Sequence, residues 1–302
     1  MKAQRRTLTA VCHDGSNGNG ADECPTSKRS RTTSQQPLFK HHHYASAFQI
    51  VDKISIIQAM KVQEASIYRP AHYLYQANVS AEDRKSLCQW GFDILNACKV
   101  NRDIAVIAIG YFDRFLSHRG LRVVEACLGN QRELQLAFIS CLVIALKGRE
   151  SMEVKPQFVA ETMCEDMYHP EEIVGMEIEI LRTLSWFLNG PTPKDFLEHF
   201  MELLPADSND EVASNLRELA CKKLEMSMLD YHLALELPSS LAHVSIASLL
   251  QDMGDEERNQ LGAASWMSRI GFVMGVSGVR NQLADIDEDE DTSCTLSNSS
   301  CL

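Results

Sequence analysis

The sequence lacks the features of several protein classes. Its ten cysteines include no Cys-x-x-Cys pair, no apolar run approaches the roughly 20 residues of a membrane span, and the first residues lack a signal-peptide core. Basic residues are also scarce: 29 Lys and Arg against 41 Asp and Glu give a formal charge of −12. Phosphate binding needs a surplus of positive charge on one face. We therefore expect neither a secreted or membrane protein nor a general nucleic-acid binder, but a protein of a reducing compartment.

Signals for strands and for catalysis are missing too. Alternating β-branched runs and Gly-Asn hairpins do not occur, and neither does a phosphate loop, a metal-ligand helix or a convincing nucleophile and base set. A histidine run at 41–43 has no accompanying cysteine or acidic ligand set, so no metal site or other cofactor is predicted. These absences predict an all-α protein that is not an enzyme.

Both ends of the chain have the composition of disordered segments. Residues 1–43 are rich in Ser, Thr, Gly, Asn and charge, and residues 284–302 form an acidic block followed by Ser and Thr. Such segments bury too little apolar surface to offset the entropy of ordering. We expect a disordered arm and a disordered acidic tail outside the fold.

The segment between the two ends has helical periodicity throughout. "RDIAVIAIGYFDRFL" (102–116) and "ELQLAFISCLVIALKG" (133–148) are apolar around most of their circumference, which is typical of central helices. Amphipathic helices are expected around them, at 86–95 with a packing face that includes Leu87 and Trp90, and at 171–187 with one that includes Val174 and Phe187.

A break separates two sets of helices. "GPTPK" at 190–194 interrupts the helical pattern, because proline lacks a backbone donor and disfavours helix at the residue before it. The segments beyond it are also helical but less apolar. This organisation predicts two helical lobes, the second short enough for its last helices to be irregular.

Three charged residues fall where the pattern would bury them at least partly. Asp113 lies on the first central helix, Lys147 at the end of the second, and Arg84 at the start of the helix before them. An unpaired buried charge costs several kcal/mol, so Arg84 and Asp113 are expected to form a structural ion pair. Glu177 can stand near Lys147 in a bundle, although Lys147 is also explained as a lysine whose ammonium reaches solvent.

These stretches resemble the cyclin box, the five-helix fold that binds and activates cyclin-dependent kinases. The resemblance spans about 82–200, and the preceding Tyr-Arg-Pro segment (68–70) is similar to one found before the box in plant and protist cyclins. Five positions that the family typically shares are filled by Arg84, Asp113, Leu136, Lys147 and Glu177.

The resemblance implies a two-lobe fold. It has a box with its preceding helix at 44–190 and a second, shorter or divergent lobe at 191–283. In the family the aspartate of "YFDRFLS" pairs with the arginine of the first box helix, which leaves Arg114 facing outward.

The resemblance also assigns a kinase-binding surface. By position, Lys147 and Glu177 should bond to the kinase helix that carries the active-site glutamate and to the loop before it, with Leu146 and Gly148 beside them. Many relatives carry Phe or Met where this chain has Gly148, so an apolar anchor worth about 1–3 kcal/mol is missing. The partner implied is a cyclin-dependent kinase, which the chain would activate without contributing a catalytic group.

A second family feature is a shallow patch that docks Arg-x-Leu segments of substrates and inhibitors. Leu87, Trp90 and Gln135 fit it together with Arg84, and Asp93 stands where an acidic residue would receive the docking arginine. Two other positions, Asp83 and Ser86, are polar where the best-known binders are apolar. Leu87 and Trp90 are equally explained as core residues.

Short motifs in the arm suggest further partners and a location. "KRSR" (28–31) resembles a nuclear-import patch, and "RRTL" (5–8) resembles the core of a destruction box recognised by a ubiquitin ligase. The expected location is the nucleus and cytoplasm, with no membrane and no direct nucleic-acid contact. Control of cell-cycle progression is the leading interpretation; a transcription-associated cyclin-box protein is the alternative.

Overall fold

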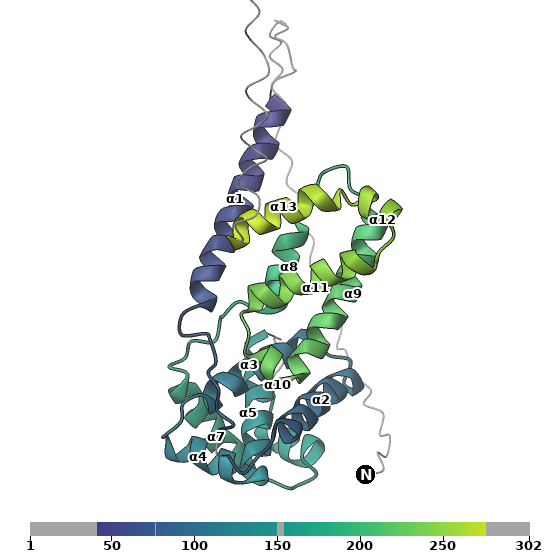
Figure 1. Ribbon diagram of the computed structural model, residues 1–302. Helices are drawn as coiled ribbons and strands as arrows, with labels where there is room; N and C mark the ends of the chain where they lie inside the picture. The colour runs from purple at the N-terminus through teal and green to yellow at the C-terminus, as the bar shows by residue number, and fades with distance from the viewer. Residues whose placement is uncertain (1–40, 76, 150–153, 276–302) are drawn as a thin grey trace, which may run out of the picture. The chain divides into compact units, whose positions relative to one another are not determined.

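The computed structural model describes residues 41–75, 77–149 and 154–275. Contacts divide the chain into Met1–His42 and His43–Leu302, and the account below concerns the second unit. Its described residues form helices and connecting turns without a strand (Figure 1), which confirms the all-α prediction. None of these helices is both long and apolar enough to cross a membrane. The predicted acidic tail lies outside the described residues, as does the arm except for 41–43, which open the first helix.

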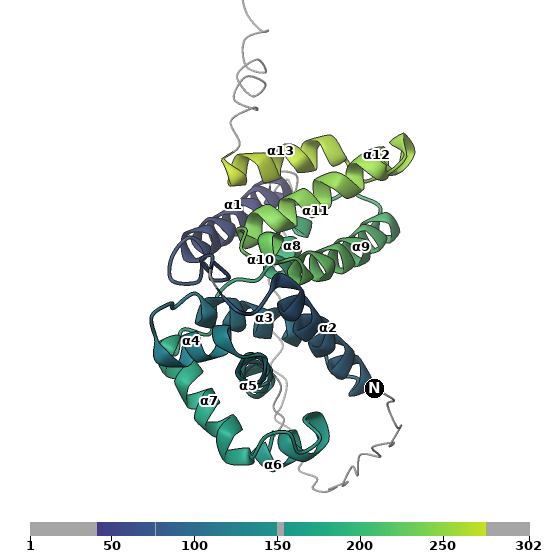
Figure 2. The ribbon, with the colours of Figure 1, turned by 60° about the horizontal axis from the view of Figure 1, so that its bottom comes forward.

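The first lobe follows an N-terminal helix, α1 (His41–Glu64), and is built around two central helices. Its elements are α2 (Ala81–Ala97), α3 (Asp103–Leu116), α4 (Arg122–Gly129), α5 (Gln131–Arg149), α6 (Pro156–Phe158), the π-helical turn η1 (Val159–Met163) and α7 (Pro170–Thr183). Figure 2 shows α5 nearly end-on, with α2, α3, α4 and α7 around it. The continuous apolar sequence of α5 is thus explained by neighbours on every side.

Close packing in this lobe depends on a glycine in α2. A Cβ atom added at Gly91 would lie 2.8 Å from the Phe138 ring of α5, nearer than unstrained atoms approach. The Phe138 ring also meets Phe112 of α3 edge to face, with centroids 5.2 Å apart. The edge-to-face contact of Phe112 with Phe138, and the absence of a Cβ atom at Gly91, therefore fix how α2, α3 and α5 pack.

The packing face of α7 differs from the expected one. Ile173, Met176 and Ile180 are buried, whereas Val174 is 36% and Phe187 50% exposed. The prediction that Val174 and Phe187 belong to the packing face is wrong. Ile180 and Leu184, which were also expected on that face, are buried. The apolar stripe on this helix is wide, so its period alone does not fix which residue at the edge turns inward. The helix ends at Thr183, before the predicted 187, and Trp186 beyond it has a φ of 62°.

The second lobe is made of regular helices as far as the structure describes it, to Met274. It comprises α8 (Pro193–Met201), α9 (Asp210–Leu229), α10 (Tyr231–Ala234), α11 (Pro238–Asp252), α12 (Asp255–Gln260) and α13 (Ala263–Met274). The "GPTPK" break falls at the start of α8, where Thr192 caps the helix and Pro193 opens it. The expectation of irregular last helices is wrong, because the fully buried Trp266 anchors α13 by donating to the Phe200 carbonyl at 2.7 Å.

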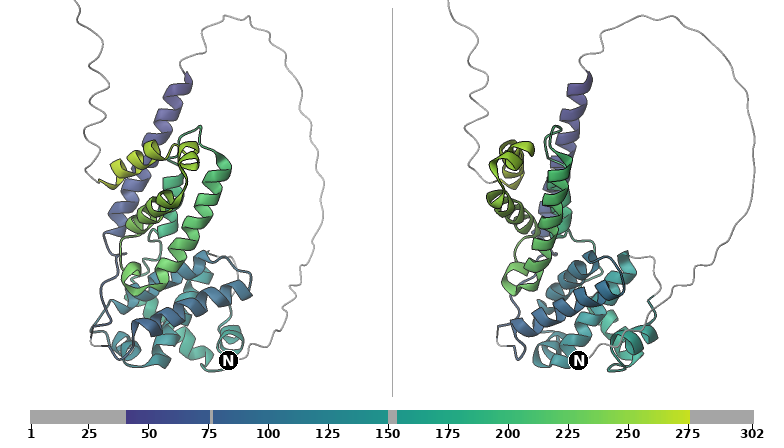
Figure 3. Two further views of the ribbon diagram at one scale, coloured as in Figure 1. Left: turned by 45° about the vertical axis from the view of Figure 1, so that its right-hand side comes forward. Right: turned by 90° about the vertical axis from the view of Figure 1, so that its right-hand side faces the viewer.

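Helix α1 precedes the first lobe in sequence but contacts the second (Figure 3). The buried Glu64 carboxylate accepts hydrogen bonds from the backbone and hydroxyl of Ser239, at the start of α11. Lys61 donates to the last two carbonyls of α13, those of Val273 and Met274, at 3.1 and 2.9 Å. A negative group thus meets a helix N-terminus and a positive group a helix C-terminus, the arrangement that helix dipoles favour.

Candidate functional site

Arg84 and Asp113 form a fully buried ion pair between α2 and α3. Arg84 Nε lies 2.8 Å from one Asp113 oxygen and Nη2 2.7 Å from the other, and both side chains are 1% exposed. Burial by itself would lower the pKa of Arg84, but the charge of Asp113, the hydrogen bonds to it and the neighbouring Cys88 and Tyr73 together raise this pKa. The bidentate geometry is the strongest that arginine and carboxylate offer.

Partners that the sequence did not reveal complete this pair. The Tyr73 hydroxyl donates to Asp113 at 2.7 Å, and Arg84 Nη1 donates to the Met228 and Leu229 carbonyls at the end of α9. Burial, and then the Asp113 charge, raise the pKa of Tyr73. The pair therefore joins the two lobes as well as two helices. The two carbonyl acceptors lie 144 and 145 residues after Arg84 and leave no signal in the sequence. Tyr73 closely follows the "YRP" segment, and that proximity is a signal by which the sequence indicates it.

Lys147 and Glu177 form a second ion pair, at the surface of the first lobe. Lys147 Nζ lies 2.8 and 2.9 Å from the two Glu177 oxygens. The lysine side chain is 40% exposed and the glutamate side chain 9%. The carboxylate is therefore anchored in the protein surface while the ammonium remains open to solvent.

The two other residues predicted beside this pair lie differently. Leu146 is 4% exposed and packs inside the lobe, so its prediction as a surface contact is corrected. It falls on the inner side of α5, where the helix is still covered by its neighbours. Gly148 is exposed, and a Cβ atom placed on it would have no neighbour within 4 Å.

Exposed apolar residues flank the surface pair. Val174 and Ile178 are 36% and 41% exposed. Val174 lies three residues before Glu177 and four before Ile178, so it neighbours both of them on the surface of α7. Val174 and Ile178 also line a shallow groove toward α6, where Phe158 is 41% exposed. Exposed apolar side chains next to charged groups that a partner can reach suit a protein-binding surface. We call this area, Lys147, Glu177, Val174 and Ile178, the α7 surface.

The predicted docking patch lies on α2 and the start of α5. Leu87, Trp90 and Gln135 are partly buried, and the Trp90 ring meets Phe138 edge to face at 6.4 Å. Asp93 is exposed and accepts a hydrogen bond from Gln89 at 2.9 Å. Leu87 and Trp90 thus contact the core and keep part of their surface open, which leaves both interpretations standing.

The Asp83 carboxylate is occupied by hydrogen bonds at the start of α2 and is not free to bond to a docked segment. Its carboxylate accepts from the backbone and hydroxyl of Ser80 at 2.8 and 2.7 Å and from Gln131 at 2.7 Å. The Ser80 hydroxyl, in return, accepts from the Asp83 backbone, so the two residues form a capping box. These bonds, the Ser80 hydroxyl first, lower the pKa of Asp83.

Arg114 does not face outward, and that prediction is wrong. The residue is only 7% exposed, and its guanidinium lies over the Tyr68 ring, 4.9 Å from the centroid. Residues 111–116 of α3 are all buried, because the segment containing Tyr68 covers the side of this central helix that the sequence pattern left open.

Metal ligands are not gathered anywhere in the described ranges: no group of three His, Cys, Asp or Glu residues there is arranged to hold an ion. The motifs at 5–8 and 28–31 lie outside the described residues. The candidate site described above is the α7 surface, with its charged pair and its exposed apolar side chains.

Comparison with known families identifies the fold. The model of the cyclin N-terminal domain matches residues 55–189, and the model of the cyclin C-terminal domain matches residues 191–285. The chain belongs to the cyclin family. As a cyclin it has the end of α1 and both lobes within the matched ranges, which meet at Gly190, shortly before α8 begins at Pro193.

Individual relatives are distant. The G1/S-specific cyclin-D1 of Xenopus laevis is 27% identical over 203 residues, covering 66% of this chain and 65% of that protein, just under two thirds of its length. The cyclin-A3-4 of Arabidopsis thaliana is 32% identical over 170 residues, covering 55% and 43%. A viral cyclin from herpesvirus saimiri superposes with a TM-score of 0.53 at 15% identity, covering 73% of this chain and 99% of that one. The structural likeness supports the two-lobe cyclin fold.

Proposed function

We propose that this cyclin is the regulatory subunit of a cyclin-dependent Ser/Thr protein kinase and acts in cell-cycle progression. The observation that carries the proposal is the α7 surface, where an exposed Lys147 pairs with a nearly buried Glu177 beside exposed apolar side chains. The relatives named G1/S-specific cyclin-D1 support a cell-cycle role. The chain supplies no catalytic group; its effect is on the conformation of the kinase.

The mechanism follows from binding energy. The cyclin favours the active position of the kinase helix only as far as it binds that position better than the inactive one. Glu177 and Lys147 keep each other neutralised in the free chain, so the surface is stable before the partner arrives. At the interface they exchange part of this pairing for bonds to kinase backbone and side chains, while Val174 and Ile178 supply buried apolar area.

A test compares matched variants in co-expression with cell-cycle kinases of the same organism. The native chain should activate one such kinase, and the double variant Lys147→Ala, Glu177→Ala should not. The control is Glu198→Ala, Arg217→Ala, which removes an exposed ion pair of the second lobe and should leave activation unchanged. Equal activation by the native chain and the Lys147 and Glu177 variant would contradict the α7 surface as the contact.

The alternative is a transcription-associated role, through a transcriptional kinase. A charge of −12 and the absence of a Cys-x-x-Cys pair disfavour a DNA-clamping initiation factor. Binding to transcriptional kinases and to no cell-cycle kinase in the same co-expression would replace the cell-cycle role with this one.

Further proposals concern substrates, turnover and location. The partly open Leu87 and Trp90 support docking of Arg-x-Leu segments, with Asp93 as the acceptor for the arginine. The arm motifs "RRTL" and "KRSR" support recognition by a ubiquitin ligase and import into the nucleus from the cytoplasm. A direct check on docking is whether Trp90→Ala weakens phosphorylation of Arg-x-Leu substrates while activity toward a short peptide lacking that segment is retained.

A further inference from the structure

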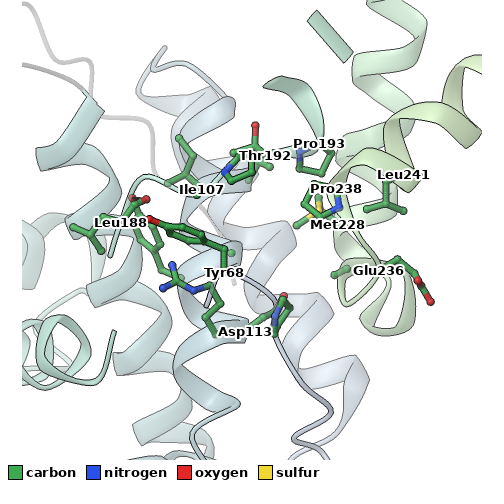
Figure 4. Close-up of a pocket in the computed structure, with 18 of the residues that line it drawn as sticks. Tyr68, Ile107, Asp113, Leu188, Thr192, Pro193, Met228, Glu236, Pro238 and Leu241 are labelled. Carbon is green, nitrogen blue, oxygen red and sulfur yellow. Dashed lines mark hydrogen bonds between the residues drawn. The ribbon is translucent and has the colours of Figure 1, made fainter. Parts of the chain in front are cut away.

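A cavity lies where the segment after α1, helix α3 and the start of the second lobe meet (Figure 4). It has a volume of about 80 Å³, room for a few water molecules, since each takes up about 30 Å³ in the liquid. Tyr68 and Arg114 line it from the first lobe side, Leu188 and Pro191 from the interlobe segment, and Leu241 from α11. The cavity is separate from the α7 surface, whose residues do not line it.

The cavity contains a buried cation without a partner. Arg114 is 93% buried (7% exposed), and its Nε atom is inaccessible and makes no hydrogen bond within the described part of the chain. The Tyr68 ring stacks on the guanidinium but offers no anion. Arginine does not lose its proton in proteins, so the full charge stays in the cavity. Water beside the guanidinium would solvate it but would not neutralise that charge.

The other charged groups of the cavity increase its positive character. Arg149, at the end of α5, also lines it and has no hydrogen-bond partner among the described residues. The Asp113 carboxylate lines it as well, but both its oxygens are already bound by Arg84 and Tyr73. Glu236 is exposed at the rim, and Figure 4 shows its carboxylate directed away from Tyr68. An incoming anion therefore passes Arg149 at the entrance and reaches Arg114, and the Asp113 carboxylate beside it is already bonded.

The rest of the wall is apolar and fixed in shape. Its apolar lining comes from Val106, Ile107, Leu188, Pro193, Met228 and Leu241. A Cβ atom at Gly190 would lie 2.4 Å from the Tyr68 ring, so this glycine lets the ring stand against the interlobe segment. The Tyr111 hydroxyl donates to the Leu188 carbonyl at 3.0 Å and holds the same segment from the other side.

We infer that this interlobe cavity binds a compact organic anion, a carboxylate or phosphate monoester on a small apolar body, whose charged group pairs with the Arg114 guanidinium through its accessible Nη atoms. The apolar body fills the space between the interlobe segment and α11, and Arg149 adds attraction at the entrance. The inference uses none of the residues of the α7 surface and stands apart from the proposed kinase partner.

One carboxylate source lies within the chain itself. Residues 285–291 include six acidic side chains, and the nine residues after Gly275 can extend over about 30 Å. A free small molecule is nevertheless favoured by the cavity, because its volume admits a compact body and its apolar wall has no counterpart in a run of aspartates and glutamates. The experiment separates the two sources.

The test is a side-chain NMR titration of the full-length, ¹⁵N-labelled chain. The probes are isobutyrate and methyl phosphate, and isobutyramide is the uncharged control of the same size as isobutyrate. The Arg114 Nε–Hε signal, identified by its absence in Arg114→Met, should shift with the two anions and not with the amide. Isothermal titration should show isobutyrate binding weakened by about tenfold or more in Arg114→Met.

Two further variants keep the result interpretable. If Arg114→Met fails to fold, the exposed Arg149→Gln provides the comparison and should weaken isobutyrate binding by a smaller factor. A native chain that binds isobutyrate and isobutyramide equally, or neither of them, overturns the inference. It is also overturned if neutralising the acids of 285–291 to Asn and Gln shifts the Arg114 signal without ligand, because the tail then occupies the cavity.

Discussion

The two ion pairs of the first lobe have the same chemistry and different surroundings. Arg84 and Asp113 are each 1% exposed and are surrounded by further hydrogen bonds, whereas Lys147 is 40% exposed and has only Glu177. Both attractions are geometrically good, so burial decides what each pair does. A pair sealed from water holds elements together. A half-open pair contributes little to stability and keeps donors and acceptors that another molecule can reach.

Breaking the buried pair should have the largest effect on stability. Arg84→Met leaves the Asp113 carboxylate buried with only Tyr73 as a partner and removes the donor to the Met228 and Leu229 carbonyls. The free energy of unfolding should fall by about 3–5 kcal/mol, measured by urea denaturation followed by circular dichroism. The control, Arg84→Met with Asp113→Leu, should recover part of the loss because no charge remains buried. A loss under about 1 kcal/mol for the single variant would contradict an architectural role.

Removing the exposed pair should weaken kinase binding and hardly change the stability of the fold. Lys147→Ala with Glu177→Ala should lower the free energy of unfolding by about 1 kcal/mol or less. It should weaken binding of the kinase by about 2–5 kcal/mol, the usual cost of losing buried interface charges. Calorimetric titration with the kinase and urea denaturation measure the two quantities on one preparation. A large loss of stability with unchanged affinity would reverse the comparison.

Adding a side chain at Gly148, next to Lys147, tests the role of the exposed pair further. Because a Cβ atom there meets nothing within 4 Å and the residue lies inside α5, Gly148→Met should be tolerated. It should stabilise the helix by about 0.5–1 kcal/mol. If the α7 surface binds the kinase, the added side chain should strengthen binding by about 1–3 kcal/mol. Gly148→Ala is the control, with the helix gain and little gain in affinity; equal affinities of the Met and Ala variants would place Gly148 outside the contact.

The smallest effect concerns the exposed capping box of α2. Ser80→Ala should cost about 1 kcal/mol of stability at pH 7, because the hydroxyl no longer caps the helix. The lowered pKa of Asp83 makes its contribution full above the usual aspartate pKa of about 3.9 and lost as pH falls through the folded value. The difference between native and variant chains, measured by denaturation from pH 7 to pH 2, should therefore shrink at the acid end. A difference that grows with acidity would contradict this assignment.

Particular residues show how far sequence reasoning reached. The apolar runs that became α3 and α5 predicted the centre of the lobe, and the expected closeness of Arg84 to Asp113 and of Lys147 to Glu177 is present in the structure. Errors occurred at residues that the sequence allowed to be either buried or exposed. Val174 and Phe187 were assigned the wrong side because periodicity locates a stripe only to within about one residue. Arg114 was assigned the wrong side because the covering segment with Tyr68 leaves no mark on the sequence of α3. Leu146, placed beside the surface pair by the resemblance, is buried.

The sequence by itself determined the helical class, the division near Gly190 and the charged pairs. These depend on local periodicity, on proline and on the cost of leaving a buried charge alone. Only the tertiary structure decided that Arg84 also reaches the end of α9, that α1 contacts the second lobe and that Arg114 stays unpaired beside a cavity. Those facts depend on burial and on carbonyls brought together across many residues, and they exist only once both lobes are packed.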